Sequence, residues 1–131
     1  MSAGPILIVD DNPVNLKLAR VLLTAEGYEV RTAAAAEEAL EVLRGFQPRL
    51  ILMDIQLPGM DGLELTRRLK ADSRMRGVVV VALTAYAMKG DEERALAAGC
   101  DAYLGKPIDT RRLAAQVAEL LSRPEEGPSR P

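Results

Sequence analysis

The sequence predicts an α/β fold in which buried parallel strands alternate with helices. Three short runs are continuously apolar, a pattern typical of strands covered on both faces of a parallel sheet: residues 6–9, 50–53 and 78–83. Segments with apolar residues at helical spacing separate these runs and leave no room for hairpins. Strict alternation of this kind gives a doubly wound parallel sheet with helices on both faces.

Two weaker segments complete a set of five expected strands. Residues 29–32 and 102–104 are shorter or more polar than the three apolar runs, so they suit the two edges of the sheet. For five strands that alternate with helices, the flavodoxin-like order 2-1-3-4-5 is the common small solution. We therefore expect a (βα)5 fold with the three apolar runs at the centre of the sheet.

The first and last helices have the clearest apolar stripes. Their apolar positions repeat at helical spacing: Val14, Leu18, Val21, Leu22 and Ala25 in the first, and Leu113, Val117, Leu120 and Leu121 in the last. We expect these stripes to cover the sheet.

The three middle helices have shorter patterns. One carries Ala36, Leu40 and Leu43 and is expected to end before Gly45 and Pro48. The next has Leu65 and Leu69 one turn apart, and the fourth, over residues 89–98, offers mainly alanines to the core. The fourth helix should therefore be among the least firmly held elements.

Length and composition exclude several classes of function. The chain has 131 residues, which fits one domain over 1–122, followed by a Pro-, Gly- and charge-rich segment, 123–131, that we expect to be a disordered tail. The formal charge of -2 gives no basic footprint for nucleic acid. No apolar stretch reaches the length of a membrane helix, and a single cysteine cannot form an intrachain disulfide. We expect a cytoplasmic monomer that binds neither nucleic acid nor membrane.

Polar side chains follow the predicted strands where the carboxyl edge of the sheet should lie. Asp10 and Asp11 follow the first run, and Asp54, Thr84 and Lys106 follow the later strands. Because ligands of open α/β sheets bind beyond this edge, three carboxylates, a hydroxyl and an ammonium should converge there.

A purely structural interpretation stays open for the first group, since Asn12 could cap the helix that starts at Pro13. Asp54 is harder to explain in this way, because a carboxylate at the edge of an apolar core is costly without partners.

The chemistry of this group indicates a magnesium-dependent phosphoryl acceptor. Converging carboxylates repel one another, and a hard divalent cation such as Mg²⁺ relieves that repulsion. Lys106 would then offer a positive charge and Thr84 a hydroxyl to the phosphoryl oxygens. Asp54 remains as the nucleophile, forming an acyl phosphate. The chain contains no histidine, so any phosphohistidine must belong to a partner.

Four sequence segments resemble the receiver domains of two-component systems over residues 4–122. They are ILIVDDNPVN, LILMDIQLPGMDGLEL, VVVALTAYAM and AYLGKPID. The chain is similar in particular to DivK-type single-domain receivers of bacterial cell-cycle control, and also to receivers of hybrid histidine kinases. The resemblance implies that Asp54 is the phospho-acceptor. It also implies that Asp11, Asp54 and the backbone carbonyl of Gln56 bind Mg²⁺, with Asp10 acting through water.

The resemblance further assigns the residues that stabilise and report the phosphoryl group. It implies that Thr84 and Lys106 bind the phosphoryl oxygens and that the Lys106–Pro107 bond is cis. Tyr103 matches the aromatic residue that moves inward with Thr84 in the active state. Tyr86 and Gln56 stand at variable positions that flank the phosphoryl group and govern entry of water.

These observations predict a single-domain response regulator that takes its phosphoryl group from a histidine kinase or a histidine phosphotransfer protein. It would catalyse only its own phosphorylation and slow dephosphorylation. Its output would run through contacts made by the fourth helix, the fifth strand and the fifth helix.

Three other interpretations of the sequence are weaker. The chain could be the receiver part of a hybrid histidine kinase. A haloacid-dehalogenase-type phosphatase is disfavoured because Gln56 stands where that family carries a second Asp, and because the chain is short for a cap. A flavodoxin-like FMN carrier is disfavoured because Asp10 and Asp11 would repel the flavin phosphate.

Overall fold

The computed structural model describes residues 4–55, 62–75, 77–84, 89–105 and 108–122, and at residues 89–92 the backbone alone. Within these ranges one parallel sheet has the strand order β2-β1-β3-β4-β5. The strands are β1 (Pro5–Val9), β2 (Glu29–Ala33), β3 (Leu50–Asp54), β4 (Val79–Thr84) and β5 (Ala102–Gly105). The predicted flavodoxin-like fold is confirmed, with the two shorter or more polar strands at the edges.

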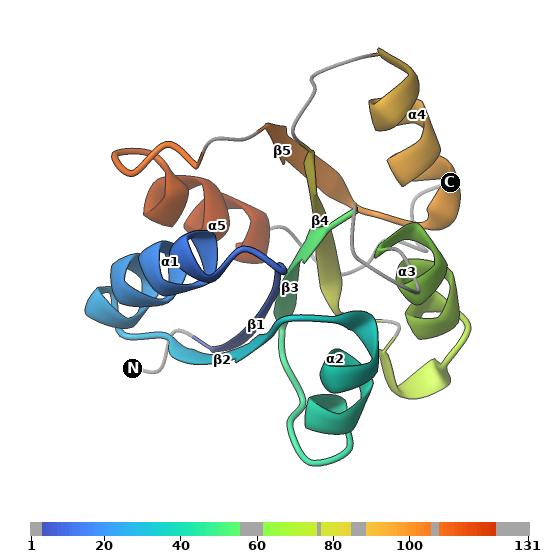
Figure 1. Ribbon diagram of the computed structural model, residues 1–131, viewed down its shortest axis with the longest axis horizontal. Coiled ribbons are helices and arrows are strands. Elements are labelled where there is room, and N and C mark those ends of the chain that lie inside the picture. The colour runs from blue at the N-terminus through green and yellow to red at the C-terminus, as the bar shows by residue number, and fades with distance from the viewer. Residues whose placement is uncertain (1–3, 56–61, 76, 85–88, 106–107, 123–131) are drawn as a thin grey trace.

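The helices cover both faces of this sheet (Figure 1). They are α1 (Pro13–Ala25), α2 (Ala36–Leu43), α3 (Gly62–Lys70), α4 (Lys89–Ala98) and α5 (Leu113–Leu121). Helices α1 and α5 pack on one face, and α2, α3 and α4 pack on the other. No helix of the described ranges is long and apolar enough to cross a membrane.

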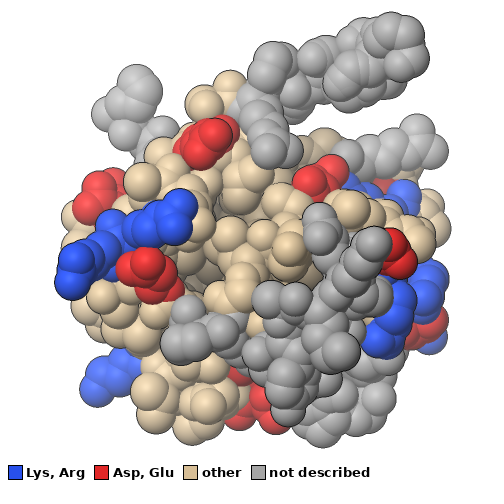
Figure 2. Space-filling view, turned by 90° about the horizontal axis from the view of Figure 1, so that it is seen from above, with Lys and Arg blue, Asp and Glu red and all other residues tan. Residues whose placement is uncertain are grey.

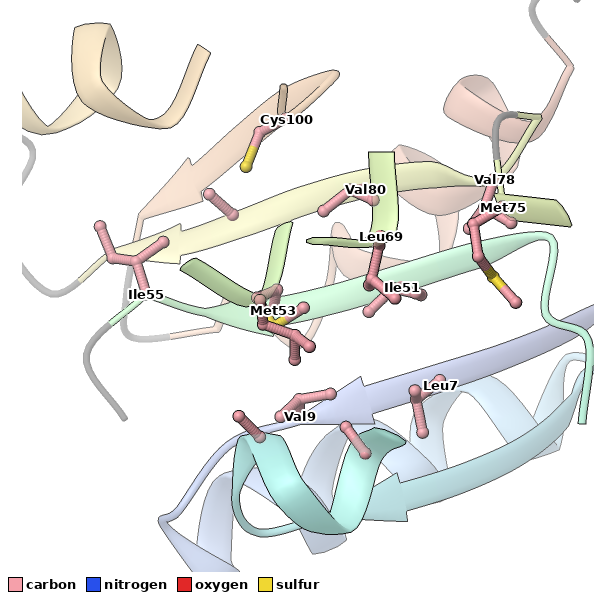
Figure 3. Packing of buried hydrophobic residues seen from close by; sticks show 14 of the residues in the cluster. Leu7, Val9, Ile51, Met53, Ile55, Leu69, Met75, Val78, Val80 and Cys100 are labelled. Atoms are coloured by element: carbon pink, nitrogen blue, oxygen red, sulfur yellow. The ribbon is translucent and has the colours of Figure 1, made fainter. Parts of the chain in front are cut away.

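Alternation along the strands divides the aliphatic core into two clusters. Leu7, Ile51 and Val80 face α2, α3 and α4, where Leu69, Met75 and Cys100 also pack (Figure 3). The intervening strand residues face α1 and α5: Ile6, Ile8, Leu50, Leu52, Val81 and Leu83. Because successive side chains of a strand point to opposite faces, strands that are apolar throughout supply both clusters.

The predicted inward stripe of α1 is only partly right: Leu22 packs against the core, but Val14, Val21 and Ala25 are exposed. Val14 and Val21 are 69% and 52% exposed, whereas Ala19 and Leu23 are fully buried, and Leu16 packs beside them. Apolar residues almost surround this helix, so more than one set of positions fits helical spacing. The observed inward stripe runs through residues 16, 19, 22 and 23, which is helical spacing. In α5 the predicted inward positions Leu113, Val117 and Leu120 are buried.

Several boundaries differ slightly from the expectation. Asp54 and Thr84 are the last residues of β3 and β4, instead of following them. A short 3-10 helix over Ser73–Met75, absent from the prediction, links α3 to β4. Segment 123–131, expected to be a disordered tail, lies outside the described residues.

Candidate magnesium and phosphoryl site

The register of the sheet brings the predicted acidic residues to one edge. Val9 of β1 pairs with Met53 of β3, so Asp10 and Asp54, the next residues along, come level with each other. Asp54 in turn pairs with Leu83 of β4, which places Thr84 one residue further along. Parallel pairing alone therefore brings together residues that lie far apart in the sequence.

The three predicted carboxylates form one cluster. Oxygen atoms of Asp10, Asp11 and Asp54 all lie within 4.8 Å of one another. Asp10 is fully buried and Asp54 is 3% exposed, whereas Asp11 is open to solvent. At this separation each pair of negative charges repels by ~3 kcal/mol for an effective dielectric constant of ~20. The donor set fits Mg²⁺, which prefers carboxylate oxygens together with water and phosphate oxygens.

Asp10 has a second set of contacts at the start of α1. Its Oδ1 accepts a hydrogen bond from the backbone N–H of Asn12 at 2.9 Å, and its Oδ2 accepts one from the side-chain amide of Asn15 at 3.3 Å. The side chain of Asn12 caps α1 by accepting from the backbone N–H groups of Val14 and Asn15. The capping role expected for Asn12 is therefore present together with the carboxylate cluster, and the two interpretations do not exclude each other.

The backbone of α3 approaches Asp54 very closely. The N–H of Gly62 donates a hydrogen bond to the carbonyl of Ile55 at 3.3 Å, at the first residue of the helix. A Cβ atom at Gly62 would lie 2.7 Å from the Cα of Ile55 and would overlap the carbonyl oxygen of Asp54. Glycine is therefore required at this position, because any side chain would push the helix away from the end of β3.

Thr84 and Tyr103 lie on the same face of the sheet. Tyr103 pairs with Ala82 and packs against the cluster covered by α2, α3 and α4. Thr84 is two residues beyond Ala82, so strand alternation directs it toward the same face. Thr84 is 3% exposed and Tyr103 is partly buried.

Four predicted residues lie outside the described residues: Gln56, Tyr86, Lys106 and Pro107. Their assigned positions therefore remain predictions. Two residues at the site were missed by the sequence reasoning, namely Asn15 and Gly62. The spacing of Asn15, one helical turn after Asn12, and the position of Gly62 at the start of a helix that follows Asp54 are the signals that could have indicated them.

The described charged side chains do not gather into one basic region on the face seen in Figure 2. Lysine and arginine side chains of the described ranges lie in separate groups toward the margins of this face, with acidic side chains among them. Several charged side chains of the described ranges form ion pairs on the surface, for example Arg67 and Arg68 with Glu64.

A doubly wound sheet with three clustered carboxylates at its carboxyl edge is the arrangement that the sequence predicted for a receiver domain. The response regulator receiver domain family matches residues 6–118, and the chain belongs to this family. The predicted resemblance is thereby confirmed, and the five predicted site residues Asp10, Asp11, Asp54, Thr84 and Lys106 all fall inside the matched range.

Individual proteins of known sequence or structure are similar over nearly the whole chain. The polar-differentiation response regulator DivK of Brucella ovis is 48% identical over 116 residues, 88% of this chain and 94% of that protein. A putative response regulator from Chloroflexus aurantiacus superposes with a TM-score of 0.86 at 32% identity, covering 92% of this chain and 98% of that one.

A third relative was solved with a metal. The receiver domain of sensor histidine kinase PA1611 from Pseudomonas aeruginosa has a TM-score of 0.83 at 36% identity, covering 92% of this chain and 98% of that one. Its crystal structure has a magnesium ion coordinated in the active site cleft.

Proposed function

We propose that this receiver domain is a phosphorylation switch whose phospho-acceptor is Asp54. The observation that carries the proposal is the setting of this carboxylate. It ends a central strand, is 3% exposed, and has oxygens of Asp10 and Asp11 within 4.8 Å. A buried negative charge beside two others is costly unless a cation binds. The edge of the sheet is therefore suited to a divalent metal and then to a phosphoryl group.

The phosphoryl group comes from a phosphohistidine of a histidine kinase or a histidine phosphotransfer protein. A carboxylate oxygen of Asp54 forms the new bond to phosphorus while the bond from phosphorus to the imidazole nitrogen breaks. The imidazole keeps the electron pair and takes up a proton, and the product on Asp54 is an acyl phosphate. Positioning and charge neutralisation supply most of what such a transfer needs, so no separate general base is required.

Asp11, Asp54 and the backbone carbonyl of Gln56 would hold Mg²⁺, with Asp10 acting through water. When bound, the ion neutralises charge that develops on the phosphoryl oxygens. The magnesium ion in the PA1611 receiver domain supports this choice of metal. The exposed Asp11 leaves the cluster open to solvent on one side, which is where a hydrated ion would enter.

Thr84 and Lys106 would bind the phosphoryl oxygens, and Tyr103 would move inward when Asp54 is phosphorylated. Thr84 and Tyr103 share a face of the sheet, so a movement of Thr84 toward the phosphoryl group frees space on the side where Tyr103 packs. The surface of α4, β5 and α5 then changes for a partner protein. Tyr86 and Gln56 would control the lifetime of the acyl phosphate.

The signalling role of the chain in the cell is also a proposal. We infer a cytoplasmic, monomeric receiver over residues 1–122 that signals through protein contacts and does not turn over a separate substrate. The similarity to a polar-differentiation response regulator supports a role in bacterial cell-cycle signalling.

Phosphorylation by acetyl phosphate tests the proposal without a partner kinase. Intact-mass spectrometry of the protein with acetyl phosphate and Mg²⁺ should show the addition of one phosphoryl group, which chelation by EDTA prevents. Asp54→Asn should abolish the addition. The matched control Asp109→Asn, which changes an exposed acid outside the carboxylate cluster, should leave it intact. Equal phosphorylation of Asp54→Asn and wild type would refute the proposal.

A further inference from the structure

Asn15 contacts the carboxylate cluster from outside it. The side chain lies in the first turn of α1, and its amide nitrogen is 3.3 Å from Oδ2 of Asp10. Asp10 is fully buried, so the direction of its carboxylate is set by the donors that the protein supplies. Those donors include the Asn15 amide at one oxygen and the Asn12 backbone N–H at the other.

The hydrogen bonds among these three residues form a closed cycle. Asp10 accepts from Asn12, the side chain of Asn12 accepts from the backbone N–H of Asn15, and the side chain of Asn15 donates back to Asp10. Each member is thus held by the other two. The start of α1 and the orientation of the Asp10 carboxylate are therefore fixed together.

This arrangement departs from the usual capping of a helix. In a capping box the third helical residue is Glu or Gln, and its side chain accepts a hydrogen bond from the backbone N–H of the N-cap residue. Here Asp10 accepts that N–H, and the third helical residue, Asn15, donates to Asp10 instead. Asn is a poorer helix former than Ala, Glu or Gln, so the residue at this position is better explained by its contact with Asp10 than by helix stability.

We propose that Asn15 is a positioning residue of the metal site, which orients Asp10 for Mg²⁺ without touching the ion. The inference rests on the proposed function of the cluster. The hydrogen bonds from Asn12 and Asn15 reach different oxygens of Asp10, so together they oppose rotation of the carboxylate. Outer residues that orient metal ligands commonly contribute about 10- to 100-fold in affinity.

Isothermal titration with MgCl₂ tests the inference directly. Asn15→Ala should raise the dissociation constant for Mg²⁺ about tenfold, because Asp10 loses the hydrogen-bond donor to one of its oxygens. Asn15→Gln, which restores an amide on a longer side chain, should recover most of the affinity. The matched control Thr24→Ala makes a similar change in helix propensity at an exposed position of α1 and should bind Mg²⁺ as wild type does.

Thermal unfolding in EDTA separates positioning from a structural role. If Asn15 served only the stability of α1, Asn15→Ala would shift Tm and leave the Mg²⁺ affinity of the folded protein unchanged, and this result would overturn the inference. Failure of Asn15→Gln to bind better than Asn15→Ala would also overturn it. If the wild type did not bind Mg²⁺, both this inference and the proposed function would be overturned. If the wild type and Asn15→Ala bound Mg²⁺ equally well, only the inference would be overturned.

Discussion

Substitution of Gly62 by alanine should destabilise the fold and damage the candidate site together. The new Cβ would overlap the carbonyl oxygen of Asp54 and lie 2.7 Å from the Cα of Ile55, and both of these neighbours are backbone atoms that cannot rotate away. Either the start of α3 or the end of β3 must shift. Overpacking of this kind costs about 2–3 kcal/mol. With ~2.1 cal/mol/K of unfolding entropy per residue over 131 residues, Tm should fall by ~7–11 °C.

Thermal unfolding and phosphorylation below the melting temperature give the two readouts. Gly62→Ala should melt earlier than wild type and should also accept phosphate from acetyl phosphate more slowly, because the displaced backbone belongs to Asp54. The control Gly45→Ala has no atom within 4 Å of its new Cβ and does not have a positive φ, so it should leave Tm unchanged or raise it slightly. Equal Tm values for Gly62→Ala and wild type would refute the close approach of α3 to Asp54.

Three further outcomes follow from the packing and from the charges. Leu65→Ala removes a fully buried side chain and should cost about 3–4 kcal/mol in urea unfolding, whereas Val21→Ala, at a position that is 52% exposed, should cost under about 0.5 kcal/mol. Hydrogen bonds from Arg74 lower the pKa of Asp72, so this pair stabilises the fold above about pH 4 and loses its effect as the pH falls through the lowered value. The Tm difference between wild type and Asp72→Asn should therefore vanish in acid, and a constant difference would contradict the assignment. Burial raises the pKa of the Cys100 thiol, so iodoacetamide should label it slowly in the folded protein and rapidly in urea.

The fold and the carboxylate cluster could be predicted because they depend on local patterns and on one topological rule. Continuous apolar runs at β1, β3 and β4 indicate buried parallel strands, and parallel strands end at a common edge. Asp10, Asp11 and Asp54 therefore had to meet once the strand order was right. No side-chain packing is needed for that argument.

The details that the sequence did not predict depend on packing in three dimensions. The inward stripe of α1 was only partly predicted, because its apolar residues allow several faces and only contact with β1, β2 and α5 selects one. The need for glycine at position 62 arises from a close approach between α3 and the end of β3, which no local pattern specifies. The bond from Asn15 to Asp10 was missed for a related reason, since the amide could as well have faced water.

Chemical trapping of the phosphorylated residue tests the central claim most directly. The protein is phosphorylated with acetyl phosphate and Mg²⁺, reduced with borohydride, which converts an aspartyl phosphate to homoserine, and digested for peptide sequencing by mass spectrometry. The account predicts homoserine at position 54 and at no other aspartate. Homoserine at Asp10 or Asp11, or modification of a serine or threonine instead, would contradict it.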